Sequence, residues 1–157
     1  MKARLYLETT IPSYYVARPS KDFVTAARQK VTQRWWTKRL ADFDIFISDV
    51  VIDEASLGEP AMATKRLALL TPFPRLAATP EAEALTQALL KSGALPLKAD
   101  RDAAHIALSA TYSMHFLRTW NCRHIANAEM LRKVEEVCRS HGFQCPVVCT
   151  PDELMGA

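Results

Sequence analysis

The sequence predicts an α/β protein, a three-layer α/β/α sandwich around a central parallel sheet of four to five strands. Three observations lead to this prediction. Short apolar segments of strand length alternate with longer segments of helical period, an order typical of parallel sheets. Helix start and stop signals separate these segments along the chain. The 157 residues, 49% of them hydrophobic, suffice for one domain with a core of its own. We therefore expect a single domain over residues 1–157.

The first strand is expected at about residues 3–7, followed by a turn or short helix over residues 12–15. A long helix should begin near Ser20, which is a suitable N-cap residue, with Asp22 in its first turn. Apolar side chains then recur at every fourth position, at Phe23, Ala27, Val31 and Trp35. This stripe predicts the helix face that packs on the sheet.

Residues 44–48 (DIFIS) are typical of a buried second strand, and the helix that follows carries Glu54 and can be capped by Asp49 or a neighbour. Gly58 and Pro60 break the chain before a further helix over residues 61–70. Residues 75–78 are a possible short strand. Thr79 as N-cap and Pro80 at the first helical position then indicate a helix that ends at Gly93.

The last third continues the alternation. An Ala-rich helix is expected from Asp100, its predicted N-cap, to about residue 113, and residues 116–120 form a strand that leads to Asn121. Residues 128–140 are helical, with Gly142 at the carboxyl end. Residues 146–149 complete the sheet before a short terminal helix.

Charge and composition exclude some classes of protein. The net charge of +3 permits a polyanionic partner but is weaker than that of a dedicated nucleic-acid-binding protein. No segment approaches the roughly 20 apolar residues of a membrane-spanning helix, and no signal-type apolar core follows the first residues, so we expect a cytoplasmic protein. Cys138, His141, Cys145 and Cys149 could be written as a zinc quartet, but their spacing lacks the paired ligands of known sites. Free thiols are the preferred interpretation.

Four oxygen-bearing side chains stand at the ends of successive strands or in the first turns of the helices that follow: Glu8, Glu54, Asp102 and Asn121. The carboxyl ends of parallel strands open into the crevice where α/β sheets bind ligands. Hydrolysis of a phosphodiester needs an activated water and charge neutralisation, which Mg²⁺ or Mn²⁺ bound by a few carboxylates supplies. The plain alternative is that acids gather near helix starts because the helix dipole favours them there.

Four segments carry a resemblance to a known family: LYLETTIPSYY, VVIDEAS, KADRDAAHIALSA and LRTWNCRHIANAE. They resemble the PIN-domain family, in particular its VapC-like toxin ribonucleases of bacterial toxin–antitoxin pairs. The resemblance implies an endoribonuclease dependent on Mg²⁺ or Mn²⁺, with Glu8, Glu54, Asp102 and Asn121 at the catalytic positions and Glu8, Asp102 and Asn121 as metal ligands. It also implies an RNA substrate, a cognate antitoxin and a homodimer.

Two of these positions depart from the family pattern. Glu8 stands where aspartate is commoner and reaches one methylene farther. Asn121 replaces an aspartate and keeps a neutral oxygen acceptor without the charge. A site with three carboxylates should hold a second metal less well.

Neighbouring side chains are assigned supporting roles. Thr9, Thr10 and Thr119 match hydroxyl positions near the family's site, although a threonine after a strand is also an ordinary cap. His105 lies three residues after Asp102 on the same helix face and could orient a carboxylate, or be a hydrogen-bonded core residue. Arg18 and Lys98 are the candidate phosphate-binding residues.

Two further functions stay open. A binding module on the same fold, without metal-dependent turnover, is suggested by Asn121 and the longer Glu8. A small phosphatase or other metal hydrolase is disfavoured, because the sequence has no aspartyl nucleophile motif of the DxDx type.

Overall fold

A five-stranded parallel sheet forms the middle of the protein. In the computed structural model, which describes residues 1–157, the strands are β1 (Ala3–Leu7), β2 (Phe43–Ser48), β3 (Arg75–Leu76), β4 (Phe116–Arg118) and β5 (Val147–Cys149). Their order across the sheet is β3-β2-β1-β4-β5, and every pairing is parallel. The amino-terminal strand therefore lies in the centre. The predicted parallel sheet of four to five strands is confirmed.

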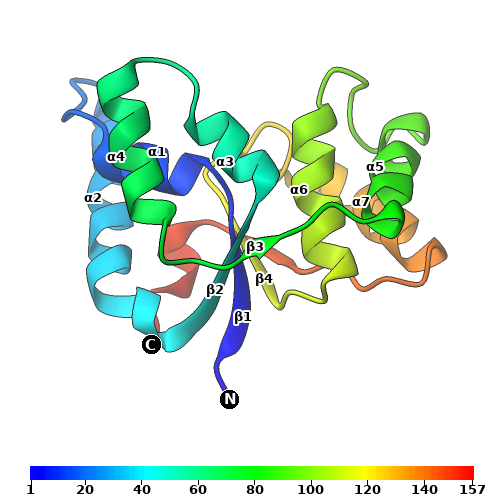
Figure 1. The fold of residues 1–157 in the computed structure, drawn as a ribbon. Coiled ribbons are helices and arrows are strands. Elements are labelled where there is room, and N and C mark those ends of the chain that lie inside the picture. The colour runs from blue at the N-terminus through cyan, green and yellow to red at the C-terminus, as the bar shows by residue number, and fades with distance from the viewer.

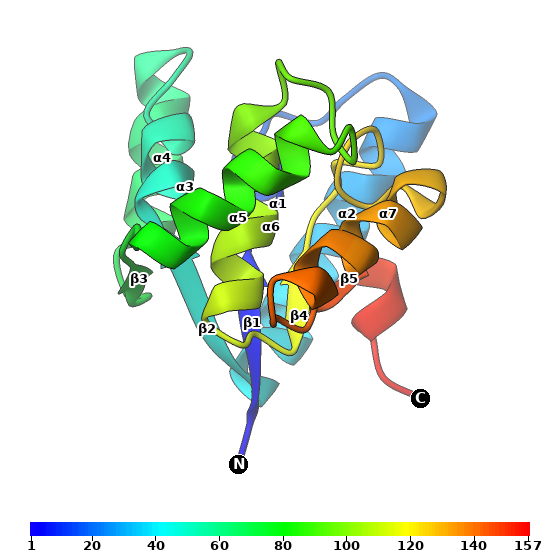
Figure 2. The same cartoon turned by 90° about the vertical axis from the view of Figure 1, so that its right-hand side faces the viewer.

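Helices cover both faces of this sheet (Figure 1). One layer contains α1 (Thr10–Val16), α2 (Phe23–Arg39) and α4 (Pro60–Leu70), with the 3-10 turns η1 (Leu40–Asp42) and η2 (Pro151–Leu154) beside α2. The other layer contains α5 (Pro80–Lys91), α6 (Asp100–Thr111) and α7 (Ala128–Ser140), which face the viewer in Figure 2. The short α3 (Asp49–Ala55) contacts both α4 and α6. The three-layer α/β/α sandwich is confirmed, and no helix is both long and apolar enough to cross a membrane.

Alternation along β1 assigns its side chains to the two layers. Leu5 and Leu7 point to one face and Tyr6 to the other, and all three are fully buried. Tyr6 meets α6 through a hydrogen bond to His105. Because side chains two positions apart share a face of a strand, Glu8, the residue after β1, continues the Tyr6 side.

A buried cation holds the last turn of the chain on the opposite face. Arg118 of β4 is fully buried, and its guanidinium lies 4.0 Å from the ring centroid of Trp35. Its Nη2 donates to the carbonyl oxygens of Thr150 and Pro151 at 3.1 and 2.9 Å. Burial lowers the pKa of Arg118 to about 10. The segment that leads into η2 is thereby tied to the sheet.

Most of the predicted local signals are present. Ser48, a neighbour of Asp49, caps α3 by accepting from the amide of Val51. Thr79 caps α5, with Pro80 at the first helical turn. Gly93 follows α5 with a φ of +76°, a backbone conformation that suits glycine.

The start of α2 differs from the prediction. The helix begins at Phe23, and its N-cap is Asp22, whose carboxylate accepts from the amide of Thr25 at 2.8 Å. Ser20 lies in the preceding turn, where its hydroxyl accepts from the amide of Asp22. Asp22, and not Ser20, is therefore the N-cap of α2.

The predicted apolar stripe of α2 was also wrong in its first half. Phe23 is 92% exposed and Ala27 is exposed. The buried side chains are Gln29, Thr32 and Trp35. With 3.6 residues per turn, a strict spacing of four moves about 40° around the helix at each step, so only the second half of the stripe, half-buried Val31 and buried Trp35, packs on the core.

Three other boundaries are corrected. Ala99 occupies the N-cap position of α6, and Asp100 lies in the first turn. β3 ends at Leu76 and β4 ends at Arg118, both two residues earlier than predicted. Beyond β4 the amide of Trp120 donates to the hydroxyl of Thr10 instead of to a neighbouring strand.

All four cysteines are free. No three of Cys138, His141, Cys145 and Cys149 bring their ligand atoms close enough together to hold a metal ion. The preference for free thiols over a zinc quartet is consistent with this arrangement.

Candidate metal site

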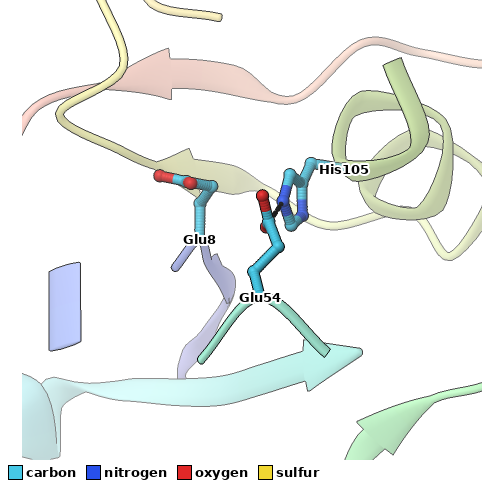
Figure 3. A group of neighbouring side chains, drawn as sticks. All are labelled: Glu8, Glu54 and His105. Atoms are coloured by element: carbon cyan, nitrogen blue, oxygen red, sulfur yellow. Dashed lines mark hydrogen bonds and ion pairs between the residues drawn. The ribbon is translucent and has the colours of Figure 1, made fainter. Parts of the chain in front are cut away.

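Two glutamates and a histidine meet at the carboxyl edge of the sheet. Glu8 directly follows β1, Glu54 lies on α3 after β2, and His105 lies on α6. One ligand atom of each lies within 4.8 Å of the others, and Figure 3 shows Glu54 and His105 joined directly, with Glu8 beside them. The sheet brings Glu8 and α3 together because β1 and β2 are adjacent and parallel. This group could hold a metal ion.

Glu8 is almost completely buried, with 3% of its surface exposed. Its Oε2 accepts three hydrogen bonds, from the amide and hydroxyl of Thr10 at 3.1 and 2.5 Å and from the hydroxyl of Thr119 at 2.6 Å. Its Oε1 accepts none. Burial raises the pKa of Glu8, and the positive charge of His105 and the threonine hydroxyls only partly offset this effect. Glu8 therefore offers one oxygen that lacks a partner.

Glu54 is oriented through a single oxygen. Its Oε1 accepts from the hydroxyl of Thr9 at 2.7 Å and lies 2.5 Å from Nε2 of His105. Burial favours a higher pKa for Glu54, but the hydrogen bonds and charge of His105 outweigh it, so the pKa lies below its ordinary value. The side chain is 21% exposed, and its Oε2 accepts no hydrogen bond from the protein.

A buried chain of hydrogen bonds fixes His105. Its Nδ1 lies 2.7 Å from the hydroxyl of Tyr6, which lies 2.7 Å from the hydroxyl of Ser48. All three residues are fully buried. Burial favours the neutral imidazole, but the hydrogen bond to Glu54 and the nearby carboxylates raise the pKa of His105 above its ordinary value. The raised pKa favours an imidazolium paired with the Glu54 carboxylate.

Asp102 and Asn121 form a second, adjoining arrangement. The side-chain nitrogen Nδ2 of Asn121 donates to Oδ1 of Asp102 at 3.0 Å. Oδ2 of Asp102 lies 2.9 Å from Nδ1 of His124. Oδ1 of Asn121 accepts from the amides of Arg123 and His124, which fixes the orientation of the side-chain amide. Both residues lie outside the three-residue group, and their role as metal ligands stays a prediction.

A pocket of about 400 Å³ opens beside Glu54. Glu54 and Asp102 line it together with Lys98, Ala99, Asp100 and Arg101. Lys98 is therefore close to the candidate site, as the sequence suggested. Arg18 is highly exposed and forms an ion pair of 3.3 Å with Glu59 instead.

The sequence interpretation missed three contributors to the site. Tyr6 and Ser48 were assigned only to strands, and Arg101, whose charge contributes to the lowered pKa of Glu54, was not singled out. The alternation of β1 places Tyr6 on the side of Glu8 and could have indicated its role. The threonines at 9, 10 and 119 were expected near the site, and the structure places all three on its glutamates.

Comparison with known proteins adds no family assignment: no family model matches the chain, and no curated protein matches it significantly. The likeness to PIN-domain nucleases therefore stays a prediction.

Proposed function

We propose that the protein is a metal-dependent endoribonuclease of the PIN-domain type that hydrolyses RNA phosphodiester bonds. The observation that carries this proposal is the meeting of Glu8, Glu54 and His105 at the carboxyl edge of the sheet. The pocket beside them adds a carboxylate, Asp102, and two cationic side chains, Lys98 and Arg101.

The donor atoms suit a divalent cation. Oε1 of Glu8 and Oε2 of Glu54 accept no hydrogen bond from the protein, and hard divalent cations prefer carboxylate oxygen. The two carboxylates carry a charge that matches one such ion. In this proposal Oε1 of Glu8 is a ligand and Oε2 of Glu54 stays free beside the ion to act as the base, whereas Asp102 and Asn121 reach the ion only if their present hydrogen bonds rearrange.

Each polar group has a defined task in the proposed reaction. A bound Mg²⁺ or Mn²⁺ would supply an activated water and neutralise charge on the phosphate. Glu54, the more exposed of the two glutamates, accepts a proton from the attacking water. Lys98 and Arg101 attract the phosphate groups of the substrate to the pocket wall.

The partners belong to the same proposal. A cognate antitoxin and a homodimer are supported by the resemblance of the four sequence segments alone, and a cytoplasmic location is part of the same proposal. A pull-down of the tagged protein with its neighbouring gene product would test the antitoxin.

Cleavage of a mixed RNA substrate with Mn²⁺, Mg²⁺ or EDTA tests the activity. We expect EDTA to abolish cleavage and Glu54→Gln to reduce it by about 10²- to 10⁴-fold, the usual contribution of a general base. Glu8→Gln and Asp102→Asn should also reduce it. Asp100→Asn is the matched control, because Asp100 is an exposed residue of the same pocket. Equal cleavage by Asp102→Asn and wild type would remove Asp102 from the mechanism.

One observation favours a second candidate, an RNA-binding module without turnover. Both oxygens of Asp102 and the oxygen of Asn121 already have protein partners. This candidate predicts RNA binding in EDTA, measured by fluorescence anisotropy, with no cleavage in any divalent ion.

A further inference from the structure

His105 has the surroundings of a metal-binding histidine. In such a residue the ring nitrogen that does not bind the metal usually donates its N–H to a fixed partner, which sets the tautomer and the ring orientation. Nδ1 of His105 lies 2.7 Å from the hydroxyl of Tyr6, which Ser48 holds in turn. Nε2 of the same ring lies against Glu54, and a ligand atom of Glu8 lies within 4.8 Å of the pair. Nδ1 is thus held by the hydroxyl of Tyr6, and Nε2 is the nitrogen that can bind a metal ion.

The carboxylates of the group have the same kind of support. Thr9 holds Oε1 of Glu54, and Thr10 and Thr119 hold Oε2 of Glu8. Each of the three potential ligands is therefore oriented by a neighbouring hydroxyl. A histidine that served only the core would need no such arrangement on Glu8.

A proton alone does not satisfy the group. One proton between Nε2 of His105 and Oε1 of Glu54 serves these two atoms, at 2.5 Å. It leaves Oε1 of Glu8 without a protein partner, and this oxygen is not among the atoms that are shut off from solvent. A divalent cation bound there would give Oε1 of Glu8 and Nε2 of His105 a common partner.

We propose that His105 binds a divalent cation through Nε2, beside Glu8 and Glu54, and that this nitrogen ligand makes the site prefer Mn²⁺ or a similar first-row ion to Mg²⁺. Imidazole suits first-row transition ions, whereas Mg²⁺ is bound through oxygen. The inference rests on the metal site of the proposed function, but not on RNA cleavage.

The tautomer follows from this assignment. Nε2 must present its lone pair to the ion, so Nδ1 carries the proton and donates to the oxygen of Tyr6. The hydroxyl of Tyr6 then donates to Ser48. Nε2 and Oε1 of Glu54 then share no proton, so their contact of 2.5 Å must lengthen.

Pulsed electron paramagnetic resonance of the wild-type protein with Mn²⁺ alone tests the proposal directly. We expect a hyperfine coupling from an imidazole ¹⁴N. Absence of Mn²⁺ binding, or bound Mn²⁺ without nitrogen coupling, overturns the assignment. This measurement needs no variant and no RNA.

Calorimetric titration of His105→Gln with Mn²⁺ and Mg²⁺ gives a second readout. The ratio of Mn²⁺ to Mg²⁺ affinity should fall by about tenfold, because the amide supplies oxygen in place of nitrogen. His124→Gln is the matched control, since His124 also pairs with a carboxylate but lies outside the group. An unchanged ratio in a folded His105→Gln protein contradicts the proposal, and if that variant does not fold, the wild-type spectrum decides.

The outcomes separate this inference from the nuclease proposal. Nitrogen coupling without RNA cleavage keeps the His105 site and rejects the nuclease. Metal-dependent cleavage without nitrogen coupling keeps the nuclease with an all-oxygen site.

Discussion

Replacing Tyr6 by phenylalanine tests the buried chain of hydrogen bonds most directly. The substitution removes one hydroxyl and leaves the ring in the core. That hydroxyl bonds both His105 and Ser48 at 2.7 Å, and all three residues are fully buried. Nδ1 of His105 then has no partner, whereas Ser48 keeps the amide of Val51.

The expected loss follows from these contacts. A buried polar atom without a partner costs about 1–3 kcal/mol, and the weakened Ser48 contact adds a smaller amount, so Tyr6→Phe should lower the free energy of unfolding by about 2–4 kcal/mol. For a chain of this length, each kcal/mol shifts the melting temperature by roughly 2–4 °C. The melting temperature should therefore fall by about 5–15 °C.

Urea denaturation and thermal melting in EDTA measure this loss, and Tyr112→Phe is the matched control. The hydroxyl of Tyr112 donates to the carbonyl of Ala77 at the partly exposed surface, so its loss should cost less than about 1 kcal/mol. If Tyr6→Phe is as stable as Tyr112→Phe, the chain does not stabilise the fold in the way argued above.

Three further predictions concern the site and its rim. In EDTA, stability should fall as pH rises above 4.5 for Glu8 and above 6.5 for His105, their ordinary pKa values, because both pKa values are raised in the folded state and the stability that such groups contribute is lost as pH rises toward the folded-state pKa. The pKa of Glu54 is lowered, so this residue changes the stability only at lower pH. In Glu8→Gln the melting temperature should depend less steeply on pH than in the wild type, and parallel curves of melting temperature against pH would contradict this. Thr119→Val should cost about 2–3 kcal/mol in urea denaturation, because it removes a donor to Glu8 and the acceptor of the Asn121 amide, whereas the exposed Thr64→Val should not. Arg101→Ala should weaken RNA binding in anisotropy titrations and reduce the salt slope by about one; an unchanged slope, as expected for the exposed Lys91→Ala, would remove Arg101 from the RNA contact.

Local chemistry explains which parts of the fold could be predicted from the sequence. The pair Thr79 and Pro80 marks the start of α5 within two residues, and such signals depend on no distant contact. The stripe on α2 failed in its first half because the packing of α1, η1 and η2 against the helix, and not the spacing of apolar residues alone, decides which face is buried.

The site shows the same division. Glu8 and Glu54 were predictable because each follows a strand in the chain. The partnership of Tyr6, Ser48 and His105 depends on the register of β1 with β2 and on the docking of α6, which no single segment encodes. The orientation of Asn121 depends on two backbone amides of its own loop, which the residue type does not reveal.

The central place of the first strand has a consequence for synthesis on the ribosome. β1 is translated first, yet one of its two neighbours is β4, which begins at Phe116. One edge of β1 therefore stays unpaired until most of the chain has been synthesised. For the same period Glu8 lacks the hydrogen bond from the hydroxyl of Thr119. A nascent chain that ends before β4 is without this contact, so the glutamate reaches its final environment only after Thr119 has been synthesised.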